Sequence, residues 1–185
     1  MYEAGVSMTI EDQTYNRTSN ILVVDDDDTL LKFFKIHLNK FFSKVIVVSN
    51  AKEAVETLKE KEIDLVISDI RMPRMDGIQF MKKVKNHDPS IPVFLVSGAL
   101  LEDSEQETIE IKADGYLKKP FDIDDLHHFI DRGIKIREAY VELHTIVPDK
   151  KKFLELLQGK RQFRFIKDEE QRERAQEIMT QVKAS

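Results

Sequence analysis

The stretch ILVVDDDDTLLKFF, residues 21–34, joins an apolar run to four consecutive aspartates and then to an amphipathic segment. Its first four residues are typical of a strand buried on both faces of a parallel sheet. Leu30, Leu31 and Phe34 follow at helical spacing. Adjacent carboxylates repel each other, by roughly 1 kcal/mol at about 4 Å in water. A strand that ends in such a cluster therefore indicates a place where a cation is needed.

The same alternation of apolar runs and amphipathic segments continues along the chain. Short runs rich in Val and Ile predict strands, and the segments between them predict helices. This order favours an α/β fold with right-handed crossovers. We therefore expect a flavodoxin-like, doubly wound, five-stranded parallel sheet of order 2-1-3-4-5 with a C-terminal α-helical extension. The expected strands are Ile21–Val24, Val45–Val48, Ile63–Ile67, Val93–Val96 and Tyr116–Leu117.

Capping residues and apolar spacing predict where the helices begin. The first helix is expected from Thr29 with Asp28 as its cap, and the second behind Asn50. A fourth is expected over Glu102–Ala113, where apolar residues are few, and a fifth from Asp122. The pattern of this fifth helix runs unusually long. Two shorter helices are expected after it, in PDKKKFLELLQG and KDEEQRERAQEIMTQV.

Polar side chains follow the expected strands at the points where they end. Asp25 and Asp26 follow the first strand, Asp69 the third, Ser97 the fourth and Lys119 the fifth. The carboxyl ends of parallel strands meet at one edge of the sheet, where ligands bind in this architecture. Oxygen ligands with no cysteine or histidine beside them favour Mg²⁺.

At this point the chain resembles the receiver domain of bacterial two-component response regulators. The resemblance covers about residues 20–140. Four motifs in order carry it: VVDDDD at 23–28, SDIRMPRMDG at 68–77, VSGA at 96–99 and GYLKKPF at 115–121. Each motif alone is weak evidence, whereas four at successive strand ends are specific.

The resemblance implies that Asp69 is the phosphoacceptor. It would receive a phosphoryl group from a histidine kinase or a phosphotransfer protein, with Mg²⁺ as cofactor. Such a protein is a signalling phosphoacceptor rather than an enzyme acting on other substrates. The implied metal ligands are Asp25, Asp26, Asp69 and the backbone carbonyl of Arg71.

The resemblance also implies a switch. The Lys119 ammonium would pair with one phosphoryl oxygen, and the Ser97 hydroxyl would donate to another. Movement of Ser97 opens space that Tyr116 fills, which changes the face formed by helix 4, strand 5 and helix 5. That face or the C-terminal helices would control self-association as a homodimer or binding of a downstream protein. Nucleic acid and membranes are not expected partners.

Three alternatives stay open at this stage. Asp25 to Leu30 also fits D-x-D-x-T-L, the nucleophile motif of haloacid dehalogenase-like phosphatases, with Asp25 as nucleophile and Asp27 as acid/base. That hypothesis leaves Asp69 and its proline loop unexplained. A degenerate receiver that acts only as a binding module is the second alternative. DNA binding by the tail is a minor third, because its charges are mixed.

The remaining expectations concern boundaries and location. Residues 1–19 are expected to form a disordered leader, 20–140 the receiver domain and 141–185 the helical extension. The chain has no cysteine, which suits a reducing cytoplasm, and no apolar run approaches the ~20 residues that span a bilayer. We also interpret the adjacent His127 and His128 as a solvated helix face, and Gly77 as a permissive turn residue.

Overall fold

The computed structural model contains one parallel sheet of five strands in the order β2-β1-β3-β4-β5. This confirms the expected fold and strand order. The structure describes residues 18–98, 113–157, 159 and 161–184. The strands are β1 (Asn20–Val24), β2 (Lys44–Val48), β3 (Leu65–Asp69), β4 (Val93–Ser97) and β5 (Gly115–Lys118).

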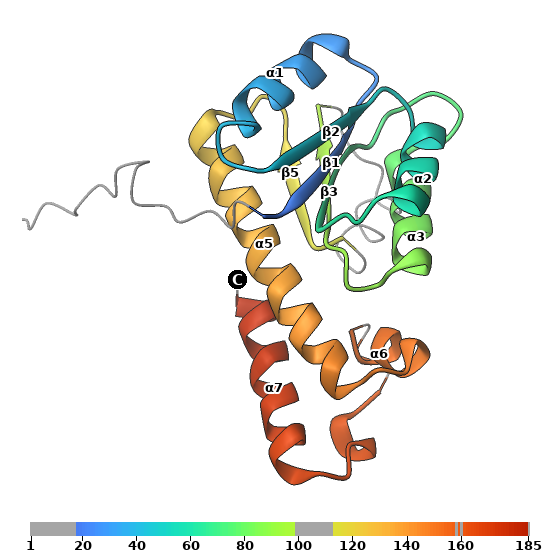
Figure 1. Cartoon of the computed structure of the whole chain (residues 1–185), viewed down its shortest axis with the longest axis vertical. Coiled ribbons are helices and arrows are strands. Elements are labelled where there is room, and N and C mark those ends of the chain that lie inside the picture. Colours follow the sequence, from blue (N-terminus) through green and yellow to red (C-terminus); the bar gives the residue numbers. More distant parts are fainter. Residues whose placement is uncertain (1–17, 99–112, 158, 160, 185) are drawn as a thin grey trace, which may run out of the picture.

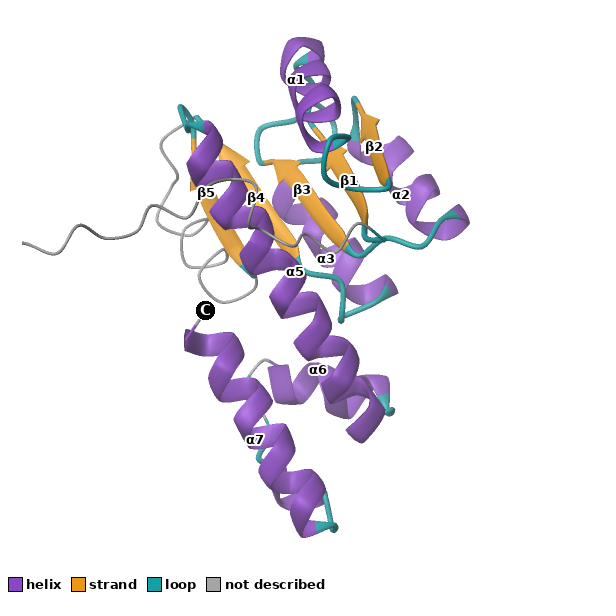
Figure 2. Ribbon diagram, turned by 60° about the vertical axis from the view of Figure 1, so that its left-hand side comes forward, coloured by secondary structure: helices purple, strands orange, loops and turns teal. Residues whose placement is uncertain are grey.

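Helices cover both faces of the sheet. The helices α1 (Asp28–Leu38) and α5 (Ile123–Ile146) lie on one face, whereas α2 (Ala51–Glu60) and α3 (Gly77–His87) lie on the other (Figures 1 and 2). The expected leader up to residue 17 and the expected fourth helix up to residue 112 lie outside the described residues.

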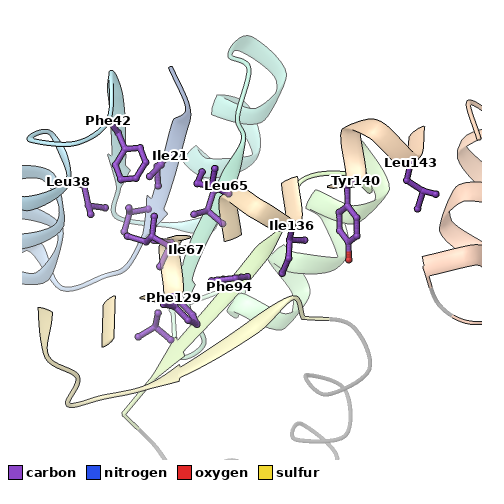
Figure 3. Packing of buried hydrophobic residues seen from close by; sticks show 14 of the residues in the cluster. Ile21, Leu38, Phe42, Leu65, Ile67, Phe94, Phe129, Ile136, Tyr140 and Leu143 are labelled. Carbon is purple, nitrogen blue, oxygen red and sulfur yellow. The ribbon is translucent and has the colours of Figure 1, made fainter. Parts of the chain in front are cut away.

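Alternate residues of each buried strand face two separate apolar clusters. Ile21 and Val23 pack with α1 and α5, whereas Leu22 and Val24 pack with α2 and α3. Figure 3 shows the first cluster, which extends from Leu38 near β2 to residues in the second half of α5. The period of two along the strands thus divides the core into two layers.

The second half of α5 runs beyond the sheet. Its 24 residues span about 36 Å at 1.5 Å per residue, about twice the length of a five-residue strand. The helix begins near the carboxyl end of β5 and runs back against the strand direction. Its later turns therefore project past the amino edge of the sheet (Figure 2).

A helical extension packs against this projecting part of α5. It consists of α6 (Lys150–Leu157), a short 3-10 helix η2 (Phe163–Phe165) and α7 (Glu169–Ala184). The buried side chains of Phe153 and Ile178 belong to the same cluster as the α1 and α5 face of the sheet. From the sequence, the apolar stripes of the tail are expected to pack either on the rest of the chain or on a second subunit, and in this structure they pack on α5 of the same chain.

Local predictions were right at most helix starts and wrong at one. Asn50 caps α2 by accepting from the Glu53 amide at 2.9 Å, as expected. The cap of α1 is Asp27 rather than Asp28, because its Oδ1 accepts from the Thr29 amide at 2.8 Å and Asp28 is already helical.

Two other interpretations were wrong. His127 is buried, at 3% exposure, because the first turns of α5 pack on α1. Its Nε2 lies 2.9 Å from Nε2 of His37, while His128 is exposed. Gly77 is the first residue of α3 and does not have a positive φ.

Within the described ranges, no helix has both the length and the apolar character needed to cross a membrane.

Candidate functional site

Three charged side chains converge at the carboxyl edge of the sheet. Asp25 follows β1 and Asp69 ends β3, which are neighbouring parallel strands. Lys119 follows β5 and reaches across β4 to both acids. Its Nζ lies 2.8 Å from Oδ2 of Asp25 and 2.6 Å from Oδ1 of Asp69. The strand order thus gathers residues that are 94 positions apart in the sequence.

Backbone groups fix the second oxygen of each carboxylate. The Arg71 amide donates to Oδ2 of Asp69 at 2.5 Å, and the Asp27 amide donates to Oδ1 of Asp25 at 2.8 Å. The Lys119 amide donates to the Ser97 carbonyl at 2.8 Å, which ties the start of the lysine loop to the end of β4. Each charged group is therefore held in place by its own loop.

Gly77 is needed for close approach of two backbone segments. Its amide donates to the Ile70 carbonyl at 2.9 Å. A Cβ atom at this position would lie 2.1 Å from the carbonyl oxygen of Asp69, a distance that atoms do not reach without displacement of the backbone. The start of α3 is thus pressed directly against the residue at the centre of the site.

The charges of the cluster are not balanced. The side chains of Asp25 and Asp69 are 4% and 8% exposed and share one ammonium group. Burial raises the pKa of Asp25 by more than Lys119 and the Asp27 amide lower it. Burial also acts to lower the pKa of Lys119, but its hydrogen bonds to the two aspartates raise it overall. The cluster therefore stabilises a charged lysine and has capacity for further positive charge.

The donor set fits a hard divalent cation. Asp26 is exposed beside Asp25, and the carbonyl of Arg71 lies in the loop after Asp69. In the part of the chain that the structure describes, no three His, Asp or Glu side chains are close enough to form a metal cage. Mg²⁺ does not require one, because it keeps several waters and takes one or two carboxylates.

Ser97 and Tyr116 occupy different environments. Ser97 is fully buried at the end of β4, where it pairs with Lys118 of β5. Tyr116 lies on β5 and is 37% exposed. The structure thus brings Ser97 to the same edge as Asp69, while the Tyr116 side chain is partly in solvent.

A hollow beside Lys119 was not predictable from the sequence. This hollow has a volume of about 420 Å³ and lies between the start of α1 and the loop that joins β5 to α5. Phe33 in its wall is 36% exposed. An aromatic residue on the outer side of α1 is the one feature of the sequence that could have pointed to this hollow. The lining residues are Asp27, Thr29, Leu30, Phe33, Lys119, Pro120 and Phe121.

Comparisons with known proteins match the region of the chain that contains the sheet and these side chains. The model of the response regulator receiver domain matches residues 21–131. The transcriptional regulatory protein ZraR of Klebsiella oxytoca is 39% identical over 107 residues, which are 58% of this chain and 24% of that protein. The DNA-binding transcriptional regulator NtrC of Escherichia coli (strain K12) is 33% identical over 114 residues, which are 62% of this chain and 24% of that protein.

A solved structure matches over the same region. The response regulator receiver domain protein from Clostridium thermocellum has a TM-score of 0.59 and 28% sequence identity, and the match covers 65% of this chain and 97% of that chain. The chain spans about a quarter of the length of the curated relatives it matches. None of these matches favours a haloacid dehalogenase-like phosphatase over a receiver domain.

Proposed function

This chain belongs to the response regulator receiver domain family, and from that membership we propose that its Asp69 accepts a phosphoryl group from a phosphohistidine. Response regulators interact with histidine kinases or phosphotransfer proteins, which carry that donor group. The observation that carries the proposal is the position of Lys119 Nζ, within hydrogen-bond distance of both Asp25 and Asp69.

The proposed reaction is a nucleophilic substitution at phosphorus. A carboxylate oxygen of Asp69 forms a bond to phosphorus while the phosphorus–nitrogen bond to the donor histidine breaks. The imidazole leaves with the electron pair of that bond and takes up a proton. Charge spreads over the phosphoryl oxygens in the transition state, so positioned charges supply most of the catalysis. The Arg71 amide, 2.5 Å from Oδ2 of Asp69, helps to orient the nucleophile.

Lys119 and Ser97 would stabilise the transferred group. Conversion of Asp69 to an acyl phosphate removes its carboxylate charge and adds phosphoryl oxygens beside Lys119. The lysine keeps its contact with Asp25, which holds it near the new phosphate. We propose that the Ser97 hydroxyl donates to another phosphoryl oxygen, because Ser97 ends the neighbouring strand.

Mg²⁺ is the proposed cofactor. The proposed ligands are the carboxylates of Asp25, Asp26 and Asp69 and the carbonyl of Arg71. The ion would supply positive charge for the phosphoryl oxygens. The excess of acidic over basic groups at this edge supports the assignment.

We further propose that phosphorylation acts on the face of helix 4, β5 and α5. Tyr116, partly exposed on β5, would move inward as Ser97 shifts toward the phosphate. In this proposal residues 20–140 form the receiver domain and 141–185 the helical extension. The output is self-association or binding of a downstream protein, in the cytoplasm, which the absence of cysteine fits.

Labelling with a small phosphodonor tests the proposal. The full chain is incubated with acetyl phosphate and Mg²⁺, and intact mass shows whether one phosphoryl group is added. We expect labelling of the unmodified chain and of Asp25→Asn, and none of Asp69→Asn. Labelling of Asp69→Asn that disappears in Asp25→Asn would instead support the phosphatase alternative.

A lysine pair provides a matched control. Lys119→Ala is expected to slow labelling at least tenfold, because the cation nearest the nucleophile is lost. Lys118→Ala removes an exposed neighbour and is expected to leave the rate unchanged. Equal rates for the two variants would contradict the role proposed for Lys119.

A further inference from the structure

A hollow of about 450 Å³ lies where the receiver body meets the helical extension. From its lining we infer that it binds a small amphipathic anion, with an apolar tail and one carboxylate or phosphate group. Its walls come from α3, α5, α6 and α7, together with the two residues before β5. The inference does not depend on the phosphoacceptor role of Asp69, because the hollow lies away from the carboxyl edge of the sheet.

One part of the wall is apolar. Met81 of α3 and Ile136 of α5 are buried residues of the two core layers, and both line the hollow. Leu157 of α6 and Met179 of α7 complete this part from the side of the extension. A volume of this size is within the range of about 300–1,000 Å³ that holds small molecules in proteins.

The other part of the wall is positively charged. Lys82 of α3, Arg132 of α5 and Lys183 of α7 line the hollow and are exposed. Among the described residues, no carboxylate lies within ion-pair distance of these three groups. Each of three helices thus contributes one exposed cation to the wall of this hollow, without an ion-pair partner among the described residues.

The carboxylate in the described wall is already satisfied. Asp114 accepts from Lys85 Nζ at 2.6 Å and from the Tyr140 hydroxyl at 2.8 Å. It also accepts from the Val93 amide at 2.7 Å. Asp114 and Lys85 compensate each other, so the net charge of the described wall comes from the three exposed cations.

This combination selects for one chemical class. The three positive groups repel a cationic ligand. A neutral hydrocarbon has no negative group that could interact with them. A small polar anion leaves the apolar wall without a partner. An amphipathic anion satisfies both parts, and it would join α3 and α5 of the receiver to α7 of the extension.

Octanoate is a suitable probe, because it joins an eight-carbon chain to one carboxylate. The full chain is labelled with ¹³C at its methionine methyl groups and titrated while NMR spectra are recorded. Met81 and Met179 line the hollow, whereas Met72 and Met75 lie in the loop between β3 and α3. We expect saturable shifts of the Met81 and Met179 signals only.

Charge variants and related compounds test the selection. The double variant Arg132→Ala/Lys183→Ala is expected to bind octanoate at least tenfold more weakly. Lys135→Ala, which removes an exposed lysine from the same helix α5, is the matched control and should bind normally. Octylamine and acetate are each expected to bind at least tenfold more weakly than octanoate.

A second variant guards against a change of structure. Val182→Trp fills the hollow from the half-exposed end of α7 and is expected to abolish the shift of Met81 without loss of thermal stability. The inference is overturned by equal binding of octanoate and octylamine, by parallel shifts of all methionines, or by unchanged affinity in the double charge variant.

Discussion

The carboxyl edge and the amino edge of the sheet carry different kinds of buried contact. At the carboxyl edge, Asp25 and Asp69 are buried around one ammonium, and burial raises the pKa of Asp25. Beyond the amino edge, α5 continues and its apolar side chains pack against those of the extension, such as Phe153 of α6. The first arrangement costs stability, whereas the second supplies it. Because the two parts share one apolar cluster, we expect the extension to unfold together with the rest of the described chain.

The largest expected loss of stability comes from a substitution in the extension, and it tests whether the extension unfolds together with the rest of the chain. Phe153 is fully buried, and its ring contacts Tyr140 edge-on with centroids 6.2 Å apart. We expect Phe153→Ala to lower the free energy of unfolding by about 3–5 kcal/mol. Urea denaturation followed by circular dichroism and by tyrosine fluorescence should show one shared transition. Two separate transitions would mean that the extension folds independently.

A smaller loss is expected at the carboxyl edge from Gly77→Ala. The new Cβ would meet the Asp69 carbonyl oxygen, and overpacking of this kind costs about 1–3 kcal/mol. Displacement of Asp69 should also slow labelling by acetyl phosphate. Gly98→Ala is the matched control, because its Cβ would make an ordinary contact at 3.5 Å with Lys119. Equal stability of both variants would show that the loop adjusts freely.

A gain of about 1 kcal/mol is expected from Asp25→Asn at neutral pH without divalent cations. The Asn side chain still offers an oxygen that accepts from the Asp27 amide, and Lys119 still forms its ion pair with Asp69. Burial of the ionised Asp25 carboxylate destabilises the folded state, as its raised pKa indicates. This destabilisation of the unmodified chain is present only at pH values where Asp25 is ionised. The difference between the two chains should therefore shrink as pH falls through that pKa.

Addition of Mg²⁺ sharpens the same comparison. Preferential binding to the folded state stabilises by mass action. The melting temperature of the unmodified chain should rise more than that of Asp25→Asn. Equal shifts in both chains would argue against Asp25 as part of the cation site.

The smallest effect is expected at the seam between α1 and α5. Burial and the charges of His127 and Lys40 lower the pKa of His37. Burial and His128 lower the pKa of His127, against the opposing charges of Asp124 and Asp131. A lowered histidine pKa means that the unfolded chain binds more protons, so stability falls as pH drops below about 6.5.

Two histidine variants measure this contribution. Unfolding free energies are determined between pH 7.5 and 5.5. The slope should be shallower in His127→Gln than in the unmodified chain, whereas His128→Gln, which removes only one charge acting on His127, should change it less. If the slope of unfolding free energy against pH is unchanged in His127→Gln, the pH dependence comes from groups other than His127.

Much of the fold was predictable because the strands are buried on both faces. Runs such as Ile21–Val24 then mark strands directly, and the strand order follows from the α/β alternation. The same topology brought Asp25, Asp69 and Lys119 to one edge. Sequence alone could not show that Lys119 contacts Asp25 rather than Asp26, since that depends on how the loop after β1 turns.

The sequence-based predictions that were wrong share one cause. The roles of Asp27, His127 and Gly77 depend on what lies opposite each residue in space. Asp27 caps α1, His127 faces His37, and Gly77 abuts the backbone of Asp69. None of these neighbours is set by local spacing. Local patterns therefore predict elements well and contacts between elements poorly.

The uninterrupted course of α5 has a mechanical consequence. One end of this helix lies directly after the Lys119 loop, and its other end carries α6 and α7. A rod of about 36 Å that tilts by roughly 5° at one end sweeps about 3 Å at the other. A tilt of this size at the end near Lys119 would therefore displace the start of α6 by about 3 Å.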